Sequence, residues 1–174
     1  GQVITPQQLV ERLAKAPRVL VGEQHDNPDH HALQLWLSRE LAAQRPQGSL
    51  LLEMLNPDQQ ARVEQVQAEV RAGRAPRDTI AALAWQPGWD WGLYGALVQY
   101  QLRQPYPLLA ANLDRAEIMQ IYRARPTLQG TASAAPAVQE KLQADIRESH
   151  CGLLPDSQIP AMLAVQQQRD RRMA

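Results

Sequence analysis

The sequence predicts an α/β fold with a parallel sheet core, flanking helices and a small helical lobe. Three short apolar runs, at residues 19–22, 50–52 and 108–111, have the length and composition of buried strands. Each run is followed by a segment with helical periodicity. Alternation of strands with helices favours a parallel sheet, because each helix returns the chain to the end of the sheet where the next strand begins.

The first predicted helix follows Thr5. Threonine is a good N-cap, Pro6 suits the first helical position, and apolar residues recur at helical spacing after them. Further helical segments are predicted at residues 28–43, 57–72, 77–84, 91–101, 116–124, 138–149 and 160–172. The segments at 77–84 and 91–101 lie between the second and third strands and form the predicted helical lobe. Residues 127–137 are mostly small and include glycine and proline, which predicts a loop.

Length and composition narrow the class of protein. A chain of 174 residues predicts one domain, here residues 1–174. The 18 basic and 18 acidic side chains cancel, which argues against nucleic acid as a partner. Cys151 is the only cysteine, so an internal disulfide framework is excluded. No apolar run approaches the roughly 20 residues that cross a bilayer, and an export signal would have to precede Gly1.

Polar side chains follow all three predicted strands. Glu23 and His25 come after the first run, Glu53 after the second, and Asn112 and Arg115 after the third. Because the carboxyl ends of parallel strands share one edge, where ligands bind, we expect these side chains to converge there. Each also has a purely structural interpretation: Glu53 would pair with a buried arginine, and His25 would be a loop histidine with satisfied hydrogen bonds.

The segment after the first run also contains capping residues. Asn27 and Asp29 flank a proline at the predicted helix start, which favours capping over ligand binding for both. His30 shares a helical face with apolar residues and is predicted to point inward or along the edge of the sheet. His31 lies about 100° further round the helix and is predicted to be solvated.

The segment WQPGWDWGLY concentrates large aromatic side chains in a chain without phenylalanine. One interpretation is a helical hairpin with a core of tryptophan, because large aromatics mostly stabilise by burial. The other is an apolar wall for a planar ligand, with Tyr94, Tyr100 or Tyr106 offering a phenolate, since tyrosine is an axial ligand of ferric haem.

Five segments in the same order give the chain a resemblance to the ChaN-like haem-binding uptake family of the Tiki/TraB-like superfamily: LVGEQHDNPDHH, LLEML, WQPGWDWGLY, LLAANLDR and HCGLLP. Gly22 and His25 match the Gly-x-x-His motif of that superfamily, and Glu53 matches its downstream acid. Asn112 and Arg115 match an AAN-x-x-R segment. The resemblance covers nearly the whole chain.

The resemblance implies a haem held between two protomers, with tyrosine on the iron and histidine or basic side chains near the propionates. Tyr94 is the first candidate for the iron ligand and Tyr100 the second. The other candidate haem-binding residues are His25, His30, His150 and Arg115.

The resemblance also implies an iron-regulated lipoprotein at the outer membrane of a Gram-negative bacterium, working with an outer-membrane haem uptake system. Members of the family continue beyond an RRMA-like stretch into a second Gly-x-x-His segment, whereas this chain ends at Ala174. A truncated C-terminus is therefore expected.

Haem binding without catalysis is the leading hypothesis, since no nucleophile elbow, Walker loop or dinucleotide fingerprint occurs. The alternative is a hydrolase in which Glu23, His25 and Glu53 bind a divalent metal that polarises water. A third possibility is a scaffold without a functional site. A nucleophile made of Cys151 and His150 is disfavoured, because neighbours in sequence need not face each other.

Overall fold

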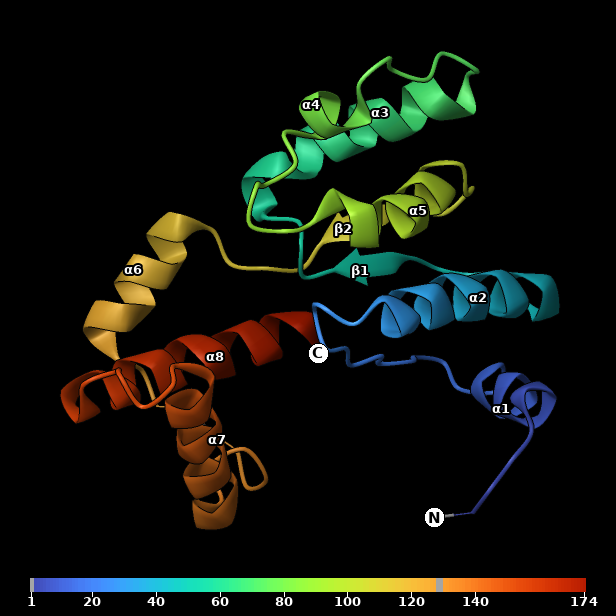
Figure 1. Ribbon diagram of the computed structural model, residues 1–174. Coiled ribbons are helices and arrows are strands. Elements are labelled where there is room, and N and C mark those ends of the chain that lie inside the picture. Colours follow the sequence, from blue (N-terminus) through green and yellow to red (C-terminus); the bar gives the residue numbers. More distant parts are fainter. Residues whose placement is uncertain (1, 128–129) are drawn as a thin grey trace. The chain divides into compact units, whose positions relative to one another are not determined.

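The computed structural model describes residues 2–127 and 130–174 (Figure 1). It confirms the α/β fold, with helices flanking a small sheet. The elements in chain order are α1 (Pro6–Leu13), α2 (Pro28–Gln44), β1 (Leu50–Leu52), η1 (Pro57–Gln59), α3 (Gln60–Arg71), α4 (Thr79–Leu83), α5 (Trp91–Leu102), β2 (Leu108–Ala110), α6 (Arg115–Ala124), α7 (Pro136–Ser149), η2 (Asp156–Gln158) and α8 (Ile159–Met173). The predicted loop at 127–137 includes residues 128 and 129, which lie outside the described residues.

The described chain divides into two compact units. The first contains residues 2–51 and 59–109, and the second contains residues 52–58, 110–127 and 130–174. In the first unit α2 packs against α1 and α5, and α3 packs against α4 and α5. In the second unit α6 and α7 both pack against α8 (Figure 1). The prediction of a single domain stays a prediction. Within the described residues, no helix combines the length and the apolar character needed to cross a membrane.

The sheet is parallel, as predicted, and consists of β1 and β2. The Leu50 N–H donates to the Pro107 carbonyl at 3.0 Å, and the Ala111 N–H donates to the Leu52 carbonyl at 3.0 Å. Residue numbers therefore rise together on both strands, which defines parallel pairing. The two predicted strands at 50–52 and 108–111 are confirmed.

The predicted strand at residues 19–22 is wrong. The structure gives these residues no strand pairing, and the side chain of Leu20 is 83% exposed. Only Val19 packs inward, against the core cluster formed by Val10, Leu37 and Leu41 of α1 and α2. The apolar run thus supplies one packing contact to a pair of helices, and composition alone cannot distinguish that role from a strand.

The start of α2 confirms one prediction and corrects another. Asn27 caps the helix by accepting a hydrogen bond from the Asp29 N–H at 2.9 Å. His31, which was predicted to be solvated, is buried, whereas His30 is only partly buried. Helical periodicity favoured His30 as the inward-pointing histidine. In the structure, the loop before α2 and Tyr94 of α5 cover His31 instead.

Candidate functional site

Four side chains of the first unit surround Glu23 and form with it a polar group, the carboxylate network. The Tyr94 hydroxyl donates to Oε1 of Glu23, and the Gln34 amide donates to Oε2. His25 Nδ1 lies 2.9 Å from Oε1. His31 Nδ1 lies 3.6 Å from Oε2, and His31 Nε2 donates to the His25 carbonyl at 2.9 Å. The Glu23 side chain is only 7% exposed, so protein groups rather than water satisfy its oxygens.

Two helix starts and one loop bring the network together. His31 and Gln34 lie in the first two turns of α2, which is capped by Asn27. Tyr94 lies in the first turn of α5, where the Asp90 side chain is the N-cap. Because caps fix where each helix begins, these local signals also fix where the three side chains point.

The aromatic cluster is partly a core, as the first interpretation predicted. Trp85 and Tyr94 are buried, and the Trp85 and Trp91 rings meet edge to face at 5.1 Å. Gly95 permits the close approach of Trp91, because a Cβ at Gly95 would lie 2.7 Å from the indole nitrogen. Packing of this kind stabilises by burial and by the edge-to-face geometry.

Trp89 and His25 form the exposed side of the same cluster. Trp89 is partly exposed, and its ring meets the His25 ring edge to face at 4.9 Å. The side chain of His25 is 52% exposed. The second interpretation, an apolar wall accessible to a ligand, is therefore compatible with these two residues, while Tyr94 lies beneath them with 1% of its surface exposed.

The other two tyrosines lie in different surroundings. Tyr100 is partly buried, with the Arg39 guanidinium 5.5 Å from its ring centroid. Tyr106 is buried, and burial raises the pKa of its phenol. A raised pKa disfavours the phenolate that iron ligation requires.

Among the predicted residues of the second unit, Glu53 forms an ion pair and the Asn112 side chain hydrogen-bonds to the backbone. Arg169 Nη1 lies 3.3 Å from Glu53 Oε1, which is the structural role that the sequence left open for Glu53. The Asn112 amide donates to the Glu53 carbonyl at 2.8 Å. Arg115 is exposed at the first position of α6. The structure thus places Glu53 and Asn112 together.

The remaining predicted histidines have backbone partners. His30 Nδ1 accepts from the Gln24 N–H at 2.9 Å, so this ring helps to hold the loop before α2. His150, at the C-terminal end of α7, donates from Nδ1 to the Ile146 carbonyl at 2.7 Å. Cys151 is exposed, and the structure records no hydrogen bond between its side chain and His150 within the described residues.

One protein-family model matches nearly the whole chain. Residues 9–174 match the family model described as haem-binding uptake, Tiki superfamily, ChaN. The chain belongs to the ChaN family. The resemblance predicted from the five segments is therefore confirmed.

A solved structure of ChaN from Campylobacter jejuni, described as showing cofacial haem binding, is similar to this chain. The two are 28% identical with a TM-score of 0.83, and the match covers 98% of this chain and 69% of the Campylobacter jejuni chain. No match was found among curated proteins.

The metal alternative gains no support from the structure. Across residues 2–127 and 130–174, no group of three or more His, Cys, Asp or Glu side chains is placed to hold a metal ion. Glu23 and His25 belong to the first unit of this ChaN-family chain and Glu53 to the second. The predicted set of Glu23, His25 and Glu53 stays a prediction.

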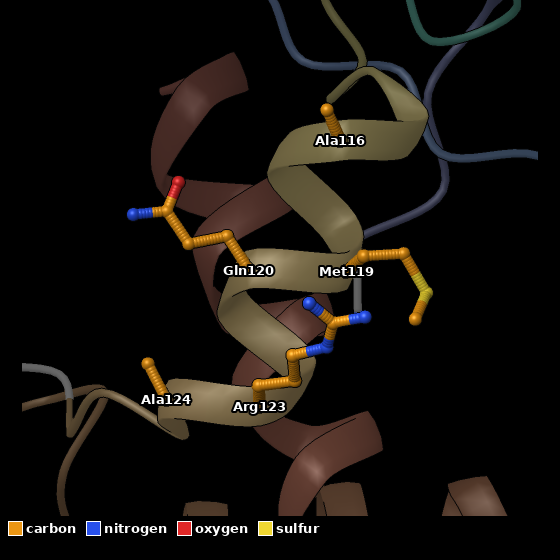
Figure 2. A pocket seen from close by; sticks show the side chains of 5 residues that line it. All are labelled: Ala116, Met119, Gln120, Arg123 and Ala124. Carbon is orange, nitrogen blue, oxygen red and sulfur yellow. The ribbon is translucent and has the colours of Figure 1, made fainter.

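A surface hollow on α6 contains none of the predicted site residues. It is lined by Ala116, Met119, Gln120, Arg123 and Ala124, all from one helix. Figure 2 shows that these side chains project from a single helix, so the hollow is open rather than enclosed. The residues that line it do not belong to the carboxylate network.

Sequence reasoning missed His31 and Gln34 as members of the network. The His30–His31 doublet was a signal, but the wrong residue of the two was preferred. Gln34 follows His31 by one helical turn, which places both on one side of α2. That spacing was the available signal.

The protonation of Glu23 should make stability depend on pH. Burial raises the pKa of Glu23, but hydrogen bonds, first from Tyr94, and the nearby His31 lower it by more. The pKa therefore lies below its ordinary value of about 4.3. A carboxyl with a lowered pKa stabilises the folded state above its unfolded pKa, and this contribution is lost as pH falls through the folded pKa.

We therefore expect the wild-type free energy of unfolding to decrease more steeply below about pH 4.3 than that of Glu23→Gln. Urea unfolding at a series of pH values measures both slopes. Equal slopes for the two proteins would show that Glu23 is not the titrating group.

Proposed function

We propose that this ChaN-family chain binds haem in iron acquisition and does so at the carboxylate network. The observation that carries the proposal is the partly exposed pair of Trp89 and His25 lying directly over buried Tyr94 and Glu23. Family membership and the haem-binding ChaN of Campylobacter jejuni support it. An apolar wall with a few placed polar groups is the usual composition of a site for a large planar ligand.

The geometry fits a planar ligand with one polar anchor. The Trp89 ring offers an apolar face, and His25 offers a ring nitrogen beside it. We propose Tyr94 as the iron ligand and Tyr100 as the second candidate. Ferric iron displaces the proton of a phenol, and the Glu23 oxygen to which Tyr94 donates is an acceptor for it. Since Tyr94 is buried, iron binding there requires the covering residues to move aside.

Titration with ferric haem tests the proposal. We expect a saturable change of the Soret band at micromolar protein, with the spectrum of oxygen-ligated, high-spin iron rather than that of a bis-histidine complex. The Tyr94→Phe variant keeps the ring and removes the oxygen, so it should lose the charge-transfer band.

The matched control is Tyr122→Phe on α6, which removes a phenol from the second unit and should leave the spectrum unchanged. No saturable Soret change in the wild type would overturn haem binding. An unchanged spectrum in Tyr94→Phe would overturn only the choice of ligand, and Tyr100→Phe would then be compared.

We propose that haem is shared by two protomers. A haem needs apolar walls on both faces to leave water, and Trp89 supplies one wall. A two-fold partner would supply the other, and cyclic dimers are the commonest symmetric assembly. In this arrangement, histidine or arginine side chains of the partner lie near the propionates.

Sedimentation velocity with and without ferric haem measures the assembly state. We expect the dimer fraction to rise with haem and to fall again in Trp89→Ala, which removes the wall. Haem bound to a strict monomer would contradict the shared pocket.

We also propose an outer-membrane lipoprotein in a Gram-negative cell envelope as the setting of this binding. This localisation is the one that the resemblance of the sequence segments implies. Fractionation of cells producing the natural gene product would test it.

A further inference from the structure

The hydrogen-bond partners of the four histidines indicate which ring nitrogens carry a proton. His30 Nδ1 accepts from a backbone N–H at 2.9 Å, which leaves the proton of a neutral ring on Nε2. His31 Nε2 lies 2.9 Å from a carbonyl oxygen, an atom that only accepts, so this nitrogen carries a proton. His150 Nδ1 lies 2.7 Å from a carbonyl oxygen, so its proton is on Nδ1.

The proton of His25 is fixed by Glu23. His25 Nδ1 lies 2.9 Å from Glu23 Oε1, and the Tyr94 oxygen lies 3.3 Å from the same nitrogen. An ionised carboxylate only accepts hydrogen bonds. If the proton were on Nε2, the Nδ1 lone pair would face the carboxylate oxygen, which is repulsive. The neutral ring therefore carries its proton on Nδ1.

We propose that Glu23 is the positioning residue of this site: it holds His25 in the Nδ1–H tautomer, with the Nε2 lone pair directed to the exposed side beside Trp89. Nδ1 faces the buried carboxylate, whereas the His25 side chain as a whole is 52% exposed. The ring of Trp89, edge to face at 4.9 Å, limits rotation from the other side.

The buried end of the arrangement is held at both oxygens. Oε1 accepts from Tyr94 as well as from His25, and Oε2 accepts from Gln34. Glu23 cannot turn without breaking these bonds, so the buried groups fix the acceptor that His25 Nδ1 meets. Carboxylates orient ligand-binding histidines in this way when the far nitrogen must meet a ligand atom.

His25 thus presents an electron-pair donor to a bound molecule, and Glu23 orients that donor. The inference concerns the unliganded chain and does not rest on haem binding. Failure of the haem titration would leave it standing, and its own failure would leave the haem titration unaffected.

Long-range ¹H–¹⁵N correlation spectra of the imidazole rings test the inference directly. They are recorded where the shifts no longer change as pH rises, so that the rings are neutral. We expect a protonated Nδ1 and an unprotonated Nε2 for His25 and His150, and the reverse pattern for His30. Single His→Gln variants assign the signals.

Two variants then connect the tautomer to its cause. In Glu23→Ala the His25 Nδ1 proton loses its acceptor, so the His25 signals should move toward the Nε2–H pattern, while His150 stays unchanged as the internal control. Tyr94→Phe keeps Glu23 and should retain the wild-type His25 pattern. A protonated Nε2 on His25 in the wild type overturns the proposal without any variant, and so does a His25 pattern in folded Glu23→Ala that is identical to the wild type.

Discussion

Replacing Glu23 with alanine is expected to lower the free energy of unfolding by about 3 kcal/mol, the loss typical of a buried charge partner removed from its network. The carboxylate accepts hydrogen bonds from Tyr94 and Gln34 and lies near His31, whose side chain is only 4% exposed. Without it, the buried Tyr94 hydroxyl and the partly buried Gln34 amide face a cavity. Each unsatisfied group costs roughly 1–3 kcal/mol, and partial relaxation reduces the sum.

Chemical denaturation with urea measures this loss, and Glu40→Ala is the matched control. Glu40 lies on α2 and is exposed, so the same substitution should change the free energy of unfolding by less than about 0.5 kcal/mol. Glu23→Gln should fall between the two, because the amide keeps one acceptor oxygen but not the charge. Equal losses for Glu23→Ala and Glu40→Ala would mean that the carboxylate network does not contribute to stability.

Local signals in the sequence predicted much of the fold. Thr5, Asn27 and Asp114 accept hydrogen bonds at three helix starts, and caps of this kind act within one turn of the chain. The predicted helices are present with ends shifted by at most two residues, except that Pro57–Gln59 forms a 3₁₀ turn ahead of α3. Such features follow from neighbouring residues and are therefore readable in a single sequence.

The carboxylate network depends on contacts between distant segments, and only part of it was predictable. Glu23 and Tyr94 were both named as candidates, but their hydrogen bond joins residues 71 positions apart. The burial of His31 is likewise a consequence of Tyr94 packing against it at 4.4 Å. Helical periodicity describes one face of one helix and contains no information about what another helix brings to a different face.

The missing strand at 19–22 has the same cause. An apolar run is compatible with a strand or with isolated packing, and the choice depends on whether another strand lies beside it. Here Val19 packs on α1 and α2, and Leu20 is exposed. Composition alone could not show that residues 19–22 lack strand pairing.

The second large effect is expected at Gln67, a buried residue of α3. Its amide donates to the carbonyls of Gln101 and Tyr106, at 3.1 and 3.0 Å, and its oxygen accepts from the Leu108 N–H at 3.2 Å. One side chain therefore links α3 to the end of α5 and to the first residue of β2. The Gln67 side chain thus hydrogen-bonds to the residue at which β2, the third predicted strand, begins.

Gln67→Leu should lower the free energy of unfolding by about 2 kcal/mol, the cost of leaving buried backbone groups unsatisfied. The loss is limited because two partners keep other bonds: the Gln101 carbonyl accepts from the Gln104 N–H, and the Tyr106 carbonyl accepts from Arg71. The Leu108 N–H loses the Gln67 oxygen, and this dominates the cost.

The matched control is Gln65→Leu, the same substitution two residues earlier on α3. Gln65 is exposed and donates only to Glu69 within the helix, at 3.1 Å, so its loss should cost less than about 0.5 kcal/mol. Urea unfolding compares the two variants, and hydrogen exchange of the Leu108 amide reports the cause. If Gln67→Leu is no less stable than Gln65→Leu, leucine packing compensates for the lost hydrogen bonds. Faster exchange at Leu108 in Gln67→Leu alone would instead assign the loss to the bond between α3 and β2.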